Sequence, residues 1–265
     1  MSTATSGPGF YGKIPSNGDF LNRRTPREFL EPWDAWLQKS IARSKEQLSD
    51  QWLDTYLTSP IWRFVLGPSI CGNQAYAGVL MPSVDKVGRY FPLTILVPIP
   101  NGFNILQLPK DMNDWFDAAE QQALNALDEP FDLDAFDKAV EQLDVPVSIS
   151  ATAYSTATTN TVSVHSSGKS TFQALATNQE MIGPYLNLLN HFLFCFNKHY
   201  SVWWTSGSPK VKPCFLTSQG LPPVEGYSGF LDGRWPLWGW HESENTKVVT
   251  QSNAQGGIIP EDWNL

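Results

Sequence analysis

The chain has 265 residues, of which 42% are hydrophobic and 17% charged, and it contains 11 tryptophans. This composition is typical of a packed globular protein and excludes a disordered chain. Its formal net charge is −8, and no basic stripe stands out along the sequence. Nucleic-acid binding is therefore disfavoured, because neutralisation of phosphates supplies most of that affinity. Anionic membrane surfaces are disfavoured for the same reason.

The sequence also indicates the cellular compartment in which the protein is located. No uninterrupted apolar run reaches the roughly 18 residues that a membrane-spanning helix requires. Residues 1–9 lack the basic and apolar segments of a signal peptide. The three cysteines, Cys71, Cys195 and Cys214, are too few and too scattered for a disulfide framework. We therefore expect a cytoplasmic protein with no direct insertion into a membrane.

The first quarter of the chain combines glycine-rich, aromatic and helical patterns. Residues 9–15 are typical of a strand that enters a turn. Residues 25–28 have the spacing of a capping box with proline at the first helical position, but Pro32 is costly inside a helix. We therefore predict a short turn, a helix at about 32–48, a second helix at about 50–57, and a strand at 61–66.

The most informative segment is residues 81–92, MPSVDKVGRYFP, which joins two apolar runs at 75–80 and 93–97. Both runs are rich in strand-forming residues, and the segment between them holds the residues that turns select. The sequence therefore predicts a hairpin. Its tip carries Asp85 and Lys86, and Arg89 follows just inside the second strand. Such charges form either a local ion pair that shapes the loop or a surface that faces a partner.

Residues 111–144 hold 11 acidic side chains and a single basic one, Lys138. Asp111 and Asp132 are good helix N-caps, and Pro130 separates two helical patterns. The acids fall mainly opposite the apolar faces. They indicate either two solvated amphipathic helices or a charged docking face for a basic partner.

The remainder predicts strands within 145–163, a central helix at 179–198, and strands at 201–205 and 213–217. Together these patterns predict a single α/β domain, an α+β arrangement in which a mixed or mainly antiparallel sheet is flanked by helices. The expected divisions are a flexible N-terminus at 1–8, the domain at 9–240 and a loose tail at 241–265.

The sequence contains only incomplete versions of cofactor-binding and catalytic motifs. Residues 167–170, SGKS, lack the upstream glycine of a phosphate-binding loop. His191, Cys195 and His199 share one helical face, but no further zinc-ligand spacing supports a metal site. No nucleophile motif accompanies the four histidines. We expect no cofactor, no metal and no catalytic residue.

The polar residues that stand near turns and strands suggest a recognition surface. These residues are Lys13, Asp19, Arg63, Asp85 and Arg89, and they form a polar patch only if the fold brings them together. The many aromatics, Trp33 and Trp36 among them, are better explained as core, although an exposed tryptophan is able to anchor an interface.

Six segments together resemble the TagF family of type VI secretion-associated regulatory proteins. They are residues 9–20 (GFYGKIPSNGDF), 33–37 (WDAWL), 56–64 (YLTSPIWRF), the hairpin at 81–92, 201–205 (SVWWT) and 220–222 (GLP). The resemblance implies a cytoplasmic, non-enzymatic repressor that acts after translation. It implies binding to the forkhead-associated scaffold protein of the secretion system, beside its threonine kinase and phosphatase pathway. The mechanism would be occupancy, in which the bound regulator withholds a component needed for assembly.

Two alternatives stay open. One is an enzyme of unknown substrate that uses a carboxylate of the 82–92 hairpin, for example Asp85 with Asp19; a deep pocket around Asp85 would favour it. The other is a structural assembly component of the secretion apparatus, which would co-purify with it in fixed proportion.

Overall fold

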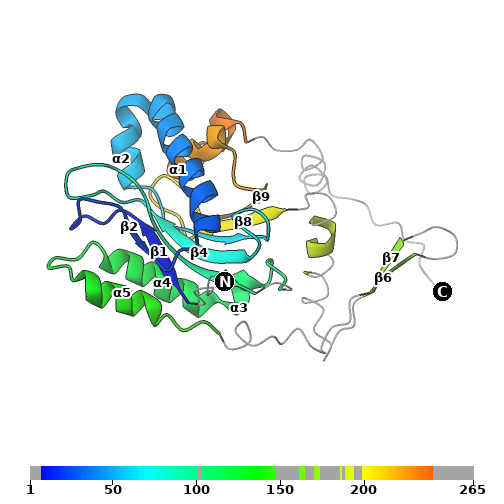
Figure 1. Ribbon diagram of the computed structural model, residues 1–265. Coiled ribbons are helices and arrows are strands. Elements are labelled where there is room, and N and C mark those ends of the chain that lie inside the picture. Colours follow the sequence, from blue (N-terminus) through cyan, green and yellow to red (C-terminus); the bar gives the residue numbers. More distant parts are fainter. Residues whose placement is uncertain are drawn as a thin grey trace, which may run out of the picture.

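The computed structural model describes residues 7–100, 103–146, 161–164, 170–173, 186, 189–193 and 199–240. A seven-stranded antiparallel sheet lies between two layers of helices (Figure 1). The predicted fold class, a single α/β domain with a mainly antiparallel sheet, is thereby confirmed. Among the described residues, no helix combines the length and apolarity needed to cross a membrane.

The strand order in the sheet is β2-β1-β5-β4-β3-β8-β9. The central meander is β3–β4–β5, and β1 enters beside β5 although the two are distant in sequence. The strands are β1 (Gly9–Gly12), β2 (Leu21–Arg23), β3 (Trp62–Leu66), β4 (Ala75–Met81), β5 (Leu93–Ile99), β8 (Tyr200–Thr205) and β9 (Cys214–Gln219).

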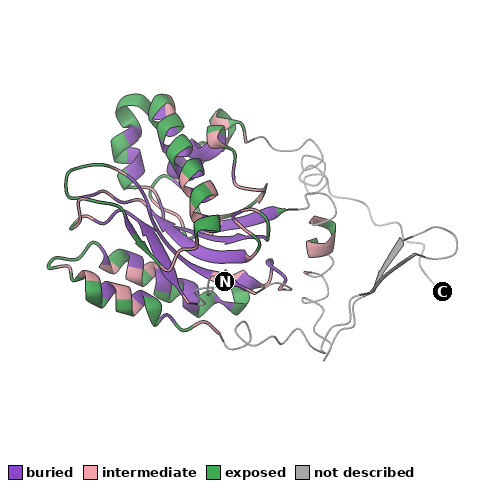
Figure 2. Cartoon of the chain, viewed as in Figure 1, coloured by how far each residue is buried: buried purple, intermediate pink, exposed green. Residues whose placement is uncertain are grey.

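The central strands are buried on both faces, as Figure 2 shows. Their sequences are therefore predominantly apolar, with Arg63 and Thr94 as exceptions, and do not alternate between apolar and polar residues. Alternate side chains enter two separate cores. On β3, Phe64 packs toward one core and Val65 toward the other. This double burial explains why the segments at 61–66, 75–80 and 93–97 were predictable as strands.

One face is covered by α1 (Arg27–Leu48), η1 (Ser49–Gln51), α2 (Trp52–Leu57), η2 (Val224–Gly226), α8 (Tyr227–Asp232) and η3 (Trp235–Trp238). Aromatic residues dominate this core. The Trp33 ring lies 4.7 Å from Phe64 and is stacked on Trp203 at 6.0 Å between centroids. Its indole nitrogen donates to Thr94 Oγ1 at 3.0 Å. The tryptophan-rich helix is thus held against the sheet by packing and by a buried hydrogen bond.

The predicted start of the first helix is wrong. Helix α1 begins at Arg27 and continues through Pro32. Thr25 does not cap this helix, because its hydroxyl group donates instead to the backbone carbonyls of Phe10 and Arg23. The proline removes one helical hydrogen bond, but Phe29 and Trp33 on either side of it are both completely buried. Tertiary packing of this stripe therefore outweighs the local preference.

The other face is covered by α3 (Leu108–Asp111), α4 (Asn113–Asn125) and α5 (Leu133–Glu141). Asp132 caps α5 as predicted, with its carboxylate accepting from the amides of Asp134 at 3.0 Å and Ala135 at 3.2 Å. The predicted cap at Asp111 is wrong, because that residue ends α3 and α4 begins after Met112.

Strands β6 (Thr161–Val164) and β7 (Ser170–Gln173) pair as a separate two-stranded sheet. The predicted helix at 179–198 lies mostly outside the described residues; positions 186 and 189–193 of it are helical. The predicted tail at 241–265 lies outside them too, as do residues 1–6, Cys195 and most of the SGKS segment.

Candidate functional site

The connection between β4 and β5 is a hairpin whose tip is closed by its own backbone. The amide of Asp85 donates to the carbonyl of Arg89, and the amide of Gly88 donates to the carbonyl of Asp85, both at 3.0 Å. Gly88 has φ of +84°, a conformation that side chains disfavour. Val84 and Tyr90 form a bridge below the tip. The hairpin predicted from residues 81–92 is therefore present, with its turn at Asp85–Gly88.

The carboxylate of Asp85 accepts four hydrogen bonds. Oδ1 accepts from the amides of Val87 at 3.0 Å and Arg89 at 2.8 Å. Oδ2 accepts from Lys13 Nζ at 2.6 Å and Arg89 Nε at 2.7 Å. The Asp85 side chain has no exposed surface. Two backbone donors and two cations thus enclose a single buried charge, which is the arrangement that a buried carboxylate requires.

These partners determine the protonation of Asp85. Burial alone would raise its pKa. The hydrogen bond from Lys13, together with those from Arg89 and the Val87 amide, overcomes that effect and holds the pKa below its ordinary value. The carboxylate is therefore ionised throughout the physiological range. Its role in this geometry is to organise the loop.

The loop between β1 and β2 is attached to the hairpin at several points. The Ser83 hydroxyl donates to the Lys13 carbonyl at 2.7 Å, and the Lys86 amide donates to the Asn17 carbonyl at 3.0 Å. The guanidinium of Arg89 donates to the Gly18 carbonyl. Two segments some 70 residues apart consequently form one unit at the end of the sheet.

Aromatic rings pack around this unit. Phe20 lies edge-on to Phe91 at 4.8 Å and is stacked on Tyr11 at 5.7 Å. The ammonium of Lys13 lies 4.8 Å from the Phe20 ring centroid, within the range of a cation–π contact. On the other side, Tyr56 of α2 both donates to and accepts from the Ser83 backbone at 3.0 Å. The loop unit is therefore supported by α2 as well as by the sheet.

The outer surface of the unit is partly apolar and carries both charge signs. Phe20 is 47% exposed and Val87 is 68% exposed. The guanidinium of Arg89 lies 4.0 Å from the Asp19 carboxylate, and both side chains face solvent. We call the surface formed by Asp19, Phe20, Val87 and Arg89 the hairpin face. Phe20 and Val87 were not among the predicted site residues, since sequence alone does not show that they are exposed.

The five predicted site residues therefore divide into three groups. Lys13 and Asp85 meet, but each residue is only 3% exposed and supports the loops from within. Asp19 and Arg89 lie on the surface above them. Arg63 does not join this cluster; its hydrogen-bonding partners lie on α4, on the side of the sheet opposite α1.

Arg63 anchors α4 to the sheet. Its guanidinium donates two bonds to Glu120, at 2.7 and 2.9 Å, and one to Asp117 at 2.6 Å. Hydrogen bonding to Glu120, which outweighs the effect of burial, raises the pKa of Arg63. The guanidinium also lies 5.9 Å from the Phe116 ring. One mostly buried cation thus holds two acids of the 111–144 segment, and its role is structural.

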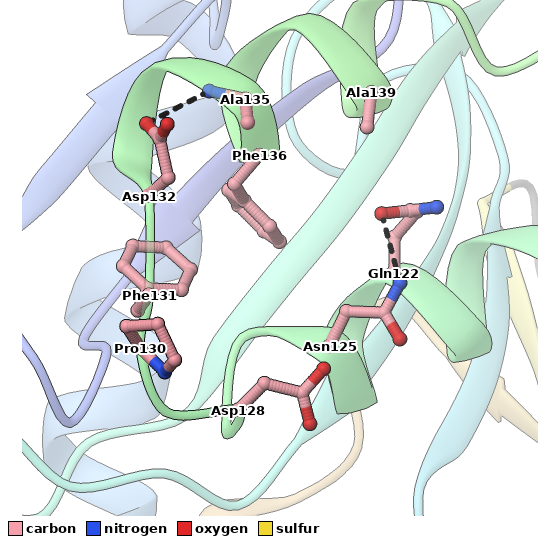
Figure 3. A pocket seen from close by; sticks show the side chains of 9 residues that line it. All are labelled: Gln122, Asn125, Asp128, Pro130, Phe131, Asp132, Ala135, Phe136 and Ala139. Carbon is pink, nitrogen blue, oxygen red and sulfur yellow. Dashed lines mark hydrogen bonds between the residues drawn. The ribbon is translucent and has the colours of Figure 1, made fainter.

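A groove runs between α4 and α5 (Figure 3). Its volume is about 360 Å³, at the lower end of the roughly 300–1,000 Å³ usual for binding pockets. The lining residues come from the end of α4, the connection after it and the inner side of α5: Gln122, Asn125, Asp128, Pro130, Phe131, Asp132, Ala135, Phe136 and Ala139. The sequence predicted the two helices but gave no sign of a hollow between them.

Among the described residues, neither the cysteine thiols nor the side chains able to bind a metal form a reactive site. Burial raises the pKa of the Cys71 thiol to about 12, so its thiolate is scarce at neutral pH. Within the described ranges, no group of three His, Cys, Asp or Glu residues is placed to hold a metal ion. His199 is described, and its Nδ1 lies 3.1 Å from the Pro68 carbonyl. Cys195, which stands between His191 and His199 on the predicted helical face, lies outside the described residues.

Comparison with known proteins identifies the family. A search of curated proteins found no match. Residues 9–143 match the model of the TagF N-terminal domain, described as type VI secretion system-associated. The crystal structure of PA0076 from Pseudomonas aeruginosa PAO1 is 35% identical and has a TM-score of 0.71; the match covers 86% of this chain and 94% of that one. The chain belongs to the TagF N-terminal domain family of type VI secretion-associated proteins.

Proposed function

We propose that the protein is a post-translational repressor of type VI secretion that works in the cytoplasm by binding the forkhead-associated scaffold protein of the system. The hairpin face is the proposed contact. Bound there, the regulator withholds the scaffold from assembly, and no chemical step is required. Family membership supports the link to secretion, while the repressor role and the scaffold partner are the proposal.

The observation that carries the proposal is the saturation of Asp85 by four donors beneath an exposed surface. The cluster fixes the backbone of two loops, so the loops lose little further conformational freedom on binding. Above it, Phe20 and Val87 offer apolar contact, and Arg89 with Asp19 offers a charged rim. A small apolar centre with a polar rim is the usual anatomy of a protein–protein interface.

The same geometry weighs against the catalytic alternative. A general acid or base needs a pKa near the working pH and a free position toward the substrate. The pKa of Asp85 is lowered by Lys13 and its other donors despite burial, and both its oxygens already accept two bonds each. We therefore propose a binding function and no enzymatic activity.

Calorimetric titration of the protein with the forkhead-associated scaffold tests the contact. Val87→Asp places a charge on the exposed tip, and Arg89→Ala removes the rim cation. We expect each to weaken binding by about tenfold or more, the cost of removing one good interface residue. The controls are Leu237→Asp and Arg27→Ala, because Leu237 is 65% exposed and Arg27 lies on the surface of α1.

Three outcomes distinguish the candidate functions. Saturable binding that only the hairpin variants weaken supports the proposal. If the hairpin variants and the controls weaken scaffold binding equally, the hairpin face is not the contact surface. No binding at high micromolar concentration would reject the scaffold as a direct partner, and co-purification in fixed proportion with the secretion apparatus would then favour the assembly-component alternative. A secretion assay of the Val87→Asp strain adds the cellular result, for which we expect loss of repression.

A further inference from the structure

We infer that the groove between α4 and α5 is a second interaction site, which receives a basic segment of a protein partner through an apolar anchor side chain. This inference goes beyond the proposed function, since it concerns a surface built from residues other than those of the hairpin face. The inference follows from the floor of the groove, its walls and its charge.

The floor is aromatic. Phe136 is buried and lies edge-on to Phe10 at 5.0 Å between centroids, which ties it to the main core. Phe131 lies 5.5 Å from Phe136 and is only partly buried. In Figure 3 both rings lie beside the hollow, with Ala135 and Ala139 on the α5 side. The two alanines and the partly exposed Phe131 ring leave room for an incoming apolar side chain.

The walls add polar groups without closing the groove. On α4, Asn125 Nδ2 donates to Gln122 Oε1 at 3.3 Å, and Gln121 Nε2 donates to Asn125 Oδ1 at 2.9 Å. These bonds position the Asn125 amide at the side of the groove (Figure 3). An open groove with ordered amides suits a chain segment that lies along the surface better than it suits an enclosed small molecule.

The groove carries negative charge that no described cation neutralises, although Oδ1 of Asp132 also accepts the two amides that it caps. Asp128 and Asp132 line it, and Glu129 between them is exposed. Among the described residues, neither Asp128 nor Asp132 has a cationic partner within 4.0 Å. The described residues that line the groove include no lysine or arginine.

Three other acids of the same segment are paired with arginines. Asp117 and Glu120 bind Arg63, and Asp137 binds Arg24 at 2.6 Å. The groove therefore combines two acids that have no described cationic partner with an apolar floor. Charge complementarity selects an occupant with lysines or arginines on both sides of a leucine- or phenylalanine-like anchor.

The probe for a test is a synthetic amphipathic peptide of lysine, leucine and alanine, with a version that carries glutamate in place of lysine as its control. Titration into isotope-labelled protein, followed by amide chemical shifts, locates the binding. We expect saturable shifts at Gln122, Asn125 and Phe131 with the lysine peptide and none with the glutamate peptide. Shifts spread over other surfaces, or no saturation, would overturn the inference.

Matched charge variants sharpen the result. Asp128→Asn with Asp132→Asn removes two groove charges and keeps the cap of α5, because asparagine caps helices about as well as aspartate. Glu141→Gln with Asp144→Asn removes two charges from exposed positions that do not line the groove. We expect the first pair to weaken peptide binding by about tenfold and the second to leave it nearly unchanged. If both pairs weaken peptide binding equally, the peptide responds only to the overall negative charge, and the groove is not a specific site.

A shape variant tests the anchor independently. Ala139→Leu fills the groove from α5, whereas Ala118→Leu adds the same side chain at an exposed α4 position outside the lining. We expect only the former to reduce binding. Val87→Asp should leave peptide binding intact, so that failure of the groove and failure of the hairpin face are distinguishable. Thermal unfolding of each variant confirms that it is folded.

Discussion

The ammonium of Lys13 lies 2.6 Å from the carboxylate of Asp85, although 72 positions separate the two residues in the chain. Both side chains are buried at the end of the sheet. The pair joins the β1–β2 loop to the β4–β5 hairpin, and the backbone contacts around it complete the connection.

Loss of the Lys13 charge should destabilise the protein. Lys13→Met keeps much of the side-chain volume but leaves Asp85 with a single cation, so we expect a loss of about 3 kcal/mol in the free energy of unfolding. Urea denaturation measures it. The exposed Lys39→Met on α1 is the matched control and should change stability by less than about 0.5 kcal/mol. A loss no larger than the control's would show that the buried pair adds nothing.

The Asp85 cluster should make stability depend on pH in acid. Burial opposes ionisation, but Lys13 and the other donors lower the pKa of Asp85 below its unfolded value. A group with a depressed folded pKa stabilises fully above the unfolded pKa, about 3.9, and loses this contribution as pH falls toward the folded value. We therefore expect urea midpoints of Asp85→Asn to vary less between about pH 5 and 2 than those of the native protein. Parallel curves would contradict this role.

Arg63 should not be replaceable by lysine. Its guanidinium binds both oxygens of Glu120 while also reaching Asp117, a geometry that an ammonium cannot reproduce. We expect Arg63→Lys to cost about 1–2 kcal/mol of unfolding free energy. Arg43→Lys, in an exposed pair with Glu46, should cost less than about 0.5 kcal/mol. Calorimetric or urea unfolding of the two variants provides the comparison, and similar values would refute the anchoring role.

Gly78 should be intolerant of any side chain. It pairs with Phe64 across β3 and β4, and a Cβ at this position would meet the Phe64 ring and lie 2.6 Å from the Ile95 carbonyl oxygen. Gly78→Ala should therefore cost about 1–3 kcal/mol through overpacking. Gly18→Ala, where a Cβ meets nothing within 4 Å, is the control. Equal melting temperatures for the two variants would disprove the close approach.

The sequence predicted those elements whose burial or capping produces a recognisable local pattern of residues. The strands at 62–66, 75–81 and 93–99 are predominantly apolar because two helical layers cover the sheet. The cap at Asp132 was predictable because capping is a local interaction. The continuation of α1 through Pro32 was not, since it depends on contacts with strands distant in sequence.

The candidate site was predicted only in part for the same reason. That Lys13 meets Asp85 depends on β1 entering the sheet beside β5, which no local pattern encodes. Arg63 was grouped with them, yet strand alternation sends it to the face opposite Trp62. The exposure of Phe20 and Val87 and the hollow between α4 and α5 arise from three-dimensional packing alone.

The position of β8 sets a limit on how the chain can be divided. The family match ends at residue 143, but β3 is completed on its outer side by β8, which begins at Tyr200. Trp203 from that strand is stacked on Trp33, and Trp36 Nε1 donates to the Pro222 carbonyl at 2.8 Å. A fragment that stops at the end of the match would leave an open strand edge beside uncovered indoles, a combination that promotes aggregation. We therefore expect a fragment of residues 9–143 not to fold stably on its own.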